Sequence, residues 1–318
     1  MNEGDFFMTQ GTLPYAYFRK KVIPAQEAKI SIASNSLQYG TNCFAGIRGY
    51  VRDGNVRIFR LRDHFERLMN AASILTFSFT LTYQEFFEIL QEMVRKNAPA
   101  GDFYIRPFIF SEDEQLGPRP KGLTFDLAIY FVSMATRYAY GEGGLSLTLS
   151  SWRKFSDAAL PTKAKAGGCY VNSFLAASDA LRHGYDDALM MDSQGFIVEA
   201  SVANILCVYR GMPISPMLGD AELDGITLRT AIELLEEEQI VVKREKIDRS
   251  MIYSLDELLL LGTAVEVATV KEVDGRQIGA RKKEEGAMHL LLKEKFRQVF
   301  AGSHPKSKQW LVPIPISP

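Results

Sequence analysis

Cysteine and histidine are both scarce in this sequence. Its 318 residues include three cysteines and four histidines. Cys43, Cys169 and Cys207 are an odd number and show no CxxC spacing, which argues against a disulfide framework and favours a reducing compartment. The four histidines are isolated from one another, so no pair has the spacing of metal ligands. We therefore expect no metal site.

Long apolar runs and an excess of charge are also missing. The run at residues 258–261 is among the longest and is far too short to span a membrane. Residues 1–5 carry acidic rather than basic side chains, unlike the start of a signal peptide. The formal net charge is −1 and the pI is about 6.5, which offers no attraction to nucleic acid or to a membrane surface. We expect a soluble, cytoplasmic protein without such partners.

The length and the hydrophobic content, 47% of 318 residues, are enough for a large core and for two domains. Patterns of strand and helix alternate along the chain, which predicts a mixed α/β or α+β fold. In the first half we expect two strands within 51–59 joined by an Asp53-Gly54 turn. A helix capped by Thr82 and strands over 103–110 and 125–134 should follow.

The composition changes at residues 135–144, where tyrosine and glycine dominate. We therefore predict a small N-terminal α/β domain over 1–134, a linker over 135–144 and a larger domain over 145–318. The larger domain should contain a helix with Val171, Phe174 and Leu181 on one face. A hairpin made by the segments 188–192 and 196–200 and an amphipathic helix over 226–238 should come after it.

Lys165 is the most informative single position. It lies in the run Pro161-Thr162-Lys163-Ala164-Lys165-Ala166-Gly167-Gly168-Cys169-Tyr170. The glycines allow a close approach of backbone to a ligand, and a partly buried lysine amine can form a Schiff base with an aldehyde. The alternative is an ordinary surface lysine in a loop. Of the two lysines in the run, only Lys165 has Ala-Gly-Gly directly behind it.

Glu199 is the second candidate, at the end of the predicted hairpin. It begins the segment Glu199-Ala200-Ser201-Val202-Ala203-Asn204-Ile205, where small neighbours let an acid reach into a cleft. Near a pyridine nitrogen, such an acid would keep that nitrogen protonated and strengthen pyridoxal phosphate as an electron sink. The alternative is a surface acid at a hairpin end.

Three features suit a phosphate group. Gly225-Ile226-Thr227 opens a predicted helix, whose free N–H groups and dipole favour an anion. Arg67 is a planar, bidentate donor, and Gly262-Thr263-Ala264 adds a hydroxyl at a turn between apolar strands. Each also has a purely structural reading: a helix start that binds only water or a cap, a solvated helix face and a strand-connecting turn.

A further group of residues suits a carboxylate. Tyr39 and Arg48 bracket a segment that contains two glycines. Tyr104 and Arg106 fall on one face of a predicted strand, because side chains alternate with period two. A phenol and a guanidinium that project together can bind a carboxylate. The alternative is a tyrosine packed in the sheet beside an arginine that extends to water.

Taken together, these segments resemble the class IV, or fold type IV, pyridoxal-phosphate aminotransferases, and most closely the branched-chain amino acid aminotransferases. The resemblance runs from about residue 29 to about residue 273. Its specific pieces are Tyr39-Gly40 through Phe44-Ala45-Gly46-Ile47-Arg48, Tyr104-Ile105-Arg106-Pro107, Ser150-Ser151-Trp152, Ala164-Lys165-Ala166-Gly167-Gly168, Glu199 through Asn204, Gly225-Ile226-Thr227 and Gly262-Thr263-Ala264. The resemblance implies a two-domain fold whose larger, C-terminal domain is β-barrel-like with helices.

The same resemblance implies pyridoxal 5′-phosphate as the cofactor. Lys165 would form the internal aldimine and then move the proton between Cα and C4′. Glu199 would pair with the pyridine nitrogen, and Tyr170 would hydrogen-bond the ring oxygen. The residues implied to hold the phosphate are Arg67, Gly225, Ile226, Thr227 and Thr263.

The implied reaction is a ping-pong transamination between leucine, isoleucine or valine and 2-oxoglutarate. Tyr104 and the turn at Thr263 and Ala264 would bind the α-carboxylate, and Arg106 the distal carboxylate of glutamate. The residues implied to bind substrate are Tyr39, Phe44, Arg48, Tyr104, Arg106, Trp152, Thr263 and Ala264. The partners would be amino acids and 2-oxo acids, and the family forms homodimers or larger assemblies.

Several positions depart from the family pattern. Ala45 stands where the family commonly has glutamate, Cys169 where it has asparagine, and Asp224 and Thr269 where it has proline. Leu228 follows the threonine where an arginine is usual. None of these changes removes the lysine, the acid or the arginine implied to hold the cofactor. They bear instead on substrate preference and turnover.

Other functions stay open. A D-amino acid aminotransferase or an aminodeoxychorismate lyase could use the same fold, and a non-catalytic relative could keep it for binding. The D-specific enzymes tend to carry Arg-x-His where this chain has Arg106-Pro107-Phe108. The lyases usually lack the tyrosine and arginine pair. Retention of Lys165 and Glu199 favours an enzyme over a non-catalytic relative.

Overall fold

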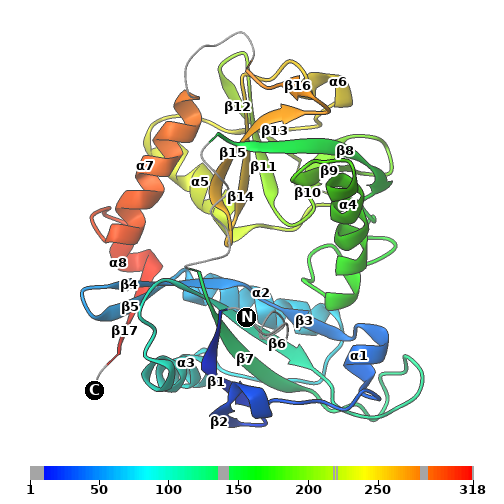
Figure 1. The fold of residues 1–318 in the computed structure, drawn as a ribbon, viewed down its shortest axis with the longest axis vertical. Coiled ribbons are helices and arrows are strands. Elements are labelled where there is room, and N and C mark those ends of the chain that lie inside the picture. Colours follow the sequence, from blue (N-terminus) through cyan, green and yellow to red (C-terminus); the bar gives the residue numbers. More distant parts are fainter. Residues whose placement is uncertain (1–10, 135–142, 218, 220, 280–285, 317–318) are drawn as a thin grey trace, which may run out of the picture. The chain divides into compact units, whose positions relative to one another are not determined.

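Two units make up the chain in the computed structural model, which describes residues 11–134, 143–217, 219, 221–279 and 286–316 (Figure 1). The first unit is Met1–Ala139 together with Pro305–Pro318, and the second is Tyr140–His304. The boundary at 139 and 140 falls inside the segment 135–144 predicted as a linker, of which residues 135–142 lie outside the described part.

The first unit is built on one eight-stranded sheet with the order β17-β5-β4-β6-β7-β1-β2, in which β3 also pairs with β6. Helix α3 packs against β1 and β17, and α2 packs against β3. The elements are β1 (Thr12–Phe18), β2 (Lys21–Pro24), α1 (Asn35–Tyr39), β3 (Asn42–Phe44), β4 (Ile47–Arg52), β5 (Asn55–Phe59), α2 (Leu61–Ile74), α3 (Tyr83–Asn97), β6 (Phe103–Phe110), β7 (Asp126–Ser133), α8 (Ser307–Trp310) and β17 (Leu311–Pro315).

Local sequence explains most of these elements. Thr82 caps α3 with a capping box, in which its hydroxyl accepts from the Glu85 N–H and the Glu85 carboxylate accepts from the Thr82 N–H. Asp53 and Gly54 both have positive φ angles, 52° and 72°, as the tight turn between β4 and β5 requires. Burial alternates along the first six residues of β6, so Tyr104 and Arg106 lie on the same face of the strand, as predicted.

The second unit contains a nine-stranded sheet with the order β10-β9-β8-β15-β14-β11-β12-β13, in which β16 pairs with β15. An additional pairing of β10 with β11 closes six of these strands into a ring, which is the barrel-like arrangement expected from the sequence. The elements are β8 (Leu145–Arg153), α4 (Tyr170–Arg182), β9 (Asp187–Met191), β10 (Ile197–Ala200), β11 (Asn204–Tyr209), β12 (Met212–Pro216), α5 (Ile226–Glu237), β13 (Lys243–Glu245), α6 (Arg249–Ile252), β14 (Glu257–Gly262), β15 (Glu266–Val273), β16 (Arg276–Gln277) and α7 (Ala287–Ala301).

Apolar side chains such as Leu147, Ile205 and Leu260 fill the core of this second sheet. Each fully buried side chain of this size stabilises the fold by roughly 1.5–3 kcal/mol. Helix α4 packs on β8 and β9, α5 on β14 and β11, and α7 on β14 and β15. The mixed α/β fold predicted from the sequence is confirmed.

Helix α4 buries an unexpected face. Its buried residues are Ser173, Ala176 and Ala180, whose small side chains let the helix approach β8 and β9 closely. The side chains of the predicted apolar stripe face outward: Phe174 is 69% exposed and Leu181 is 63% exposed. The helical period was therefore predicted well, but the face that packs on the sheet was not the most apolar one.

The end of the chain departs from the predicted domain division. Residues 305–318 were assigned to the second domain, but they belong to the first unit. The reason is that β17 pairs antiparallel with β5, with Leu311 opposite Phe59. No helix in the described part of the chain is long and apolar enough to cross a membrane.

Candidate active site

Lys165 lies just before α4 in the second unit. Its neighbours Ala164 and Ala166 are buried, while Lys165 itself is half-buried. The segment before it is fixed by Thr162, whose N–H and hydroxyl both donate to Asp157. The Lys165 Nζ atom is 5.3 Å from the centre of the Tyr170 ring. The predicted lysine and tyrosine therefore lie together, with the amine in a partly dry environment.

Lys163, the other lysine of the run, has a different role. Its Nζ donates to the backbone carbonyls of Gly219, at 3.1 Å, and Glu222, at 3.3 Å. These bonds tie the lysine run to the segment that leads into α5. Because its amine is already committed to two carbonyls, Lys163 is poorly placed to attack an aldehyde, and Lys165 remains the better candidate.

Glu199 is buried rather than exposed at the end of its hairpin. Its side chain is 7% exposed and forms an ion pair with Lys154, which is itself 10% exposed. The Leu223 N–H donates to Glu199 Oε2 at 3.2 Å, and the Asn204 side chain is 3.4 Å from the same oxygen. The carboxylate is therefore held from three segments of the unit. An acid in such a place suits an interaction with a cationic ring nitrogen.

The segment before α5 links this acid to the predicted phosphate site. Asn204 Nδ2 donates to the Leu223 carbonyl at 2.9 Å. Two residues later, a Cβ at Gly225 would overlap Asn204 Oδ1, so only glycine fits there. Ile226 and Thr227 are buried, and no side chain in the described part of the chain caps the start of α5. A buried helix start without a side-chain cap favours an anion.

Two further details fit this anion site. Asp224, which directly precedes Gly225, has its Oδ1 3.6 Å from Arg229 Nε, so the arginine offsets its charge. Thr263 lies in the three-residue turn between β14 and β15, where Gly262 faces Glu266. That turn follows Leu261, which lies opposite Asn204. The predicted turn therefore sits at the same end of the sheet as Glu199.

The first unit holds the carboxylate-binding candidates. Arg48 on β4 lies directly opposite Tyr104 on β6. The Arg106 guanidinium is 4.4 Å from the centre of the Phe44 ring, and its NH2 nitrogen is 3.5 Å from the Tyr104 hydroxyl. A Cβ at Gly46 would overlap that hydroxyl, which explains the glycine. Four of the predicted residues thus gather on one face of this sheet.

Arg106 forms no ion pair with a carboxylate of the described residues. Among the residues that the structure describes, the Arg106 side chain has a long polar contact with the Tyr104 hydroxyl, and its buried Nε atom has no hydrogen-bond partner. Leaving a buried donor unsatisfied costs free energy. A bound carboxylate would supply the missing acceptor.

The remaining candidates are placed differently. Arg67 is half-buried on α2. The Tyr39 hydroxyl accepts from the Gly117 N–H at 2.7 Å. Trp152, near the end of β8 in the second unit, is 44% exposed. Ala264 follows Thr263 in its turn.

Three residues of this region were not among the predicted ones: Lys154, Asn204 and Glu222. Asn204 stood in the segment that begins at Glu199, but nothing in that segment showed its partner. Lys154 directly follows a strand, and its partner lies 45 positions later. The Glu222 side chain is 1% exposed and its Oε1 is 3.2 Å from Arg244. A buried acid of this kind leaves no local mark in a sequence.

Burial changes the acidity of two kinds of group here. It raises the pKa of Glu222 to about 8, although nearby Arg244 opposes the shift, and the charge of Glu199 adds to it. Burial also raises the pKa of the Cys169 thiol, while the charge of Lys154 lowers it. Cys169 is thus a neutral, small, buried side chain near neutral pH.

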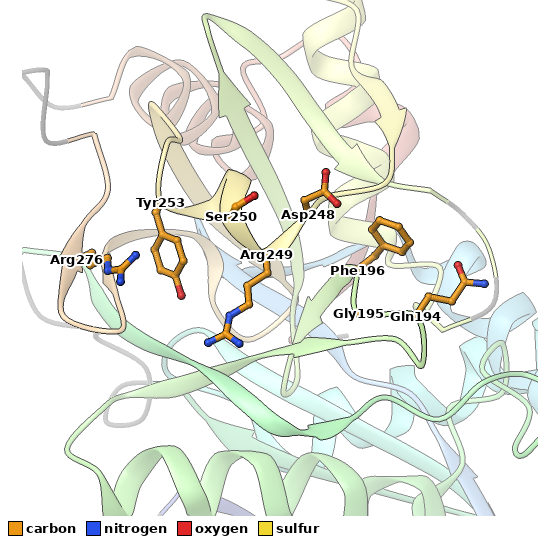
Figure 2. Close-up of a pocket in the computed structure, with 8 residues that line it drawn as sticks. All are labelled: Gln194, Gly195, Phe196, Asp248, Arg249, Ser250, Tyr253 and Arg276. Atoms are coloured by element: carbon orange, nitrogen blue, oxygen red, sulfur yellow. The ribbon is translucent and has the colours of Figure 1, made fainter.

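A surface hollow of about 520 Å³ lies elsewhere on the second unit. Figure 2 shows it beside the turn at Gln194 and Gly195, with the Arg249, Tyr253 and Arg276 side chains along it. None of its lining residues belongs to the predicted set. No cluster of three metal-ligating side chains occurs in the described part of the chain either.

Comparisons with known proteins agree with this geometry. A family model described as Amino-transferase class IV matches residues 43–273. The chain is 38% identical over 306 residues to a probable branched-chain-amino-acid aminotransferase of Aquifex aeolicus, covering 95% of this chain and 97% of that protein. It is 33% identical over 307 residues to the branched-chain-amino-acid aminotransferase of Escherichia coli, covering 96% and 98%.

Solved structures give the same result. The branched-chain aminotransferase from Thermoproteus uzoniensis with norvaline has a TM-score of 0.89 at 34% identity, covering 95% of this chain and 99% of that one. The Escherichia coli branched-chain amino acid aminotransferase has a TM-score of 0.87 at 33% identity, covering 94% and 98%. A third branched-chain amino acid aminotransferase, complexed with N-(5′-phosphopyridoxyl)-L-glutamate, has a TM-score of 0.88 at 32% identity, covering 95% and 99%. The family expected from the sequence is confirmed: the chain belongs to the class IV aminotransferases.

Proposed function

We propose that this protein is a pyridoxal-phosphate-dependent aminotransferase that moves an amino group between branched-chain L-amino acids and 2-oxoglutarate. The observation that carries the proposal is the arrangement in the second unit. There the buried Glu199 carboxylate is hydrogen-bonded to the backbone of Leu223, just before the start of α5. The Glu199 carboxylate would bind the ring nitrogen of the cofactor, and the start of α5 would bind its phosphate. The relatives named above support the choice of substrates.

The residues present fit the cofactor. The uncapped helix start at Ile226 and Thr227 can donate N–H groups to a phosphate, and glycine at 225 keeps that approach open. The Thr263 hydroxyl and the Arg67 guanidinium would complete the phosphate contacts. Pyridoxal phosphate, when bound, supplies an aldehyde for the lysine and an electron sink for the substrate carbanion.

The chain's own groups would then handle the substrate and its proton. The Lys165 amine would remove the proton from the substrate Cα and return it at C4′ of the cofactor. The Tyr170 phenol, beside Lys165 Nζ, would donate a hydrogen bond to the ring oxygen. Amino acid and oxo acid would use the same site in turn, which is a ping-pong scheme.

Arg106 would bind the distal carboxylate of glutamate. Its guanidinium forms no ion pair with a carboxylate of the described residues, and the Phe44 ring lies against the guanidinium. An arginine that lies against an aromatic ring presents both a charged edge and an apolar face. We propose that the two faces serve the acidic and the aliphatic substrates, with Tyr39, Arg48 and Trp152 as further substrate contacts.

Replacing Arg106 with alanine tests this role. Use of L-glutamate should fall by about 100-fold in kcat/KM, because a charge-assisted contact to a carboxylate is lost. Use of L-leucine should fall by less, about tenfold at most, because this substrate loses only its apolar contact with the arginine side chain. Steady-state kinetics with each substrate would measure the difference. Equal losses with both substrates would contradict the role given to Arg106.

A half-reaction screen tests the proposed function itself. The purified protein should bind pyridoxal phosphate and turn yellow, and its visible absorption band should shift when L-leucine or L-valine is added without an oxo acid. A response to D-alanine but not to L-leucine would instead favour a D-amino acid aminotransferase. A protein that takes up no pyridoxal phosphate would refute the proposal.

We also propose that the protein is cytoplasmic and works as a homodimer or a larger homo-oligomer. The three free, buried cysteines suit a reducing compartment. On α4, Val171 is 61% exposed and Phe174 is 69% exposed, an apolar surface that a subunit contact would cover. Sedimentation equilibrium would measure the assembly size, and a monomer at micromolar concentration would contradict it.

A further inference from the structure

Lys154 is a largely buried cation outside the predicted site. It directly follows β8, and its backbone N–H donates to the Met191 carbonyl at 2.8 Å. Its side chain is 10% exposed and its ammonium pairs with Glu199. Burying a charged amine is costly unless an opposite charge meets it. A lysine in this position therefore depends on the acid, and the acid on the lysine.

The three donors to Glu199 are not equivalent. Leu223 offers a backbone N–H and Asn204 a side-chain amide, both of them neutral groups on Oε2. Lys154 alone brings a full charge, and it binds the other oxygen, Oε1. With both oxygens fixed, the plane of the carboxylate is set before any ligand arrives. Such fixed orientation is what makes a polar group effective toward a bound ligand.

A second acid makes this charge more important. The charge of Glu199 contributes to the raised pKa of Glu222, so the two buried carboxyl groups interact electrostatically. Arg244 pairs with Glu222, and Lys163 binds the Glu222 carbonyl. Lys154 is the cation paired directly with Glu199. Without Lys154, the buried Glu199 carboxylate would keep only neutral donors among the described residues.

We propose that Lys154 is a positioning residue, which holds Glu199 as an oriented carboxylate for the pyridine nitrogen of the cofactor. The inference rests on the proposed function, because it assumes pyridoxal phosphate as the ligand. It does not require Lys154 to touch the cofactor. Lys154 acts through Glu199, and its effect should vanish when Glu199 or the ring nitrogen is removed.

The test compares cofactor binding by the apoproteins of wild type, K154M, K154R, E199Q and K154M/E199Q. Dissociation constants would be measured by fluorescence titration with two probes. One is pyridoxal phosphate, and the other is its analogue in which a carbon replaces the ring nitrogen. Thermal unfolding of each apoprotein would confirm that all of them are folded at the temperature of the titration.

We expect K154M to weaken binding of pyridoxal phosphate by about tenfold or more, a typical coupling for groups in one charged network. K154R, which keeps the charge, should stay within about threefold of wild type. Binding of the ring-carbon analogue should be the same in K154M and wild type. In the E199Q background, K154M should change the dissociation constant by less than about twofold.

Equal weakening of both probes by K154M would overturn the inference, because a general structural defect would act on both. Unchanged binding of pyridoxal phosphate by K154M would overturn it as well, and would leave the proposed function intact. Failure of the wild type to bind the cofactor would refute the proposed function and this inference with it. If K154M does not fold, K154Q takes its place with the same two probes: selective weakening of pyridoxal phosphate binding supports the role of Lys154, and equal weakening of both probes or no weakening refutes it.

Discussion

Lys165→Ala protein should lose transamination by at least about 10³-fold, because no other group would hold the aldehyde and move the substrate proton. Borohydride reduction should attach the cofactor to wild type and not to the variant, with mass spectrometry of the tryptic peptides locating the modified lysine. The half-reaction with L-leucine, followed by absorbance, gives the rate. The labelling and the half-reaction both depend on Lys165, but only the labelling identifies the residue directly.

Lys163→Ala is the matched control for this experiment. The two lysines are two positions apart, but Lys163 Nζ is bonded to the carbonyls of Gly219 and Glu222. Its loss should cost some stability, on the order of 1–2 kcal/mol for the lost hydrogen bonds, while most of the activity remains. Labelling at Lys163, or loss of activity in Lys163→Ala rather than Lys165→Ala, would show that the wrong lysine had been chosen.

Glu222→Gln should stabilise the apoprotein at pH 8 and change it little at pH 5. In the folded chain burial raises the pKa of Glu222 from 4.5 to about 8. Between these two values the unfolded chain carries the charge and the folded chain does not, so unfolding releases a proton. Stability contributed by this group is therefore present below about pH 4.5 and is lost as the pH rises toward 8.

The size of the effect follows from the shift. The rise in pKa from 4.5 to about 8 corresponds to at most about 5 kcal/mol, and relaxation of the folded chain would reduce what is measured. Glutamine keeps the shape and can still accept from Arg244, but it carries no charge. Urea unfolding of Glu222→Gln and wild type at pH 5 and pH 8 measures the difference.

Glu245→Gln is the control for the pH series, because Glu245 is exposed on β13 next to Arg244. Its gain in stability should not differ between the two pH values. A Glu222→Gln protein that is less stable than wild type at pH 8 would show that Glu222 is ionised and that its pair with Arg244 stabilises the fold. An equal gain at both pH values would also contradict the titration argument.

Local patterns carried much of the fold prediction. The Thr82 cap, the Asp53-Gly54 turn and the alternation along β6 each depend on residues within a few positions, and the structure has all three. The hairpin of β9 and β10 was predicted for the same reason. Where the period of a pattern decides the structure, one sequence is enough.

Pairings between distant segments could not be predicted in this way. The contact of β10 with β11 that closes the ring, and the return of β17 to β5, join strands by their edges, and edges are alike in most strands. In α4 the period was clear, but close packing selected Ala176 and Ala180 over larger apolar side chains. Packing against a particular neighbour is information that the helix alone does not contain.

The site shows the same division. The order of its motifs along the chain led to Lys165, Glu199 and the start of α5, and the structure brings Tyr170 to Lys165 and α5 to Glu199 through Leu223. The supporting charges were missed, because Lys154 meets Glu199 across 45 positions and Arg244 meets Glu222 across 22. Residues that act through another residue are visible only once the chain is folded.

The return of β17 to β5 also bears on synthesis of the protein. A ribosome makes the chain from its N-terminus, so β5 emerges early and its edge partner, residues 311–315, emerges after the whole of Tyr140–His304. Until then the β5 edge is open to pairing with other nascent chains. We therefore expect residues 311–315 to close the sheet of the first unit late in synthesis, and ribosome-bound chains that end near residue 304 to be especially prone to aggregation.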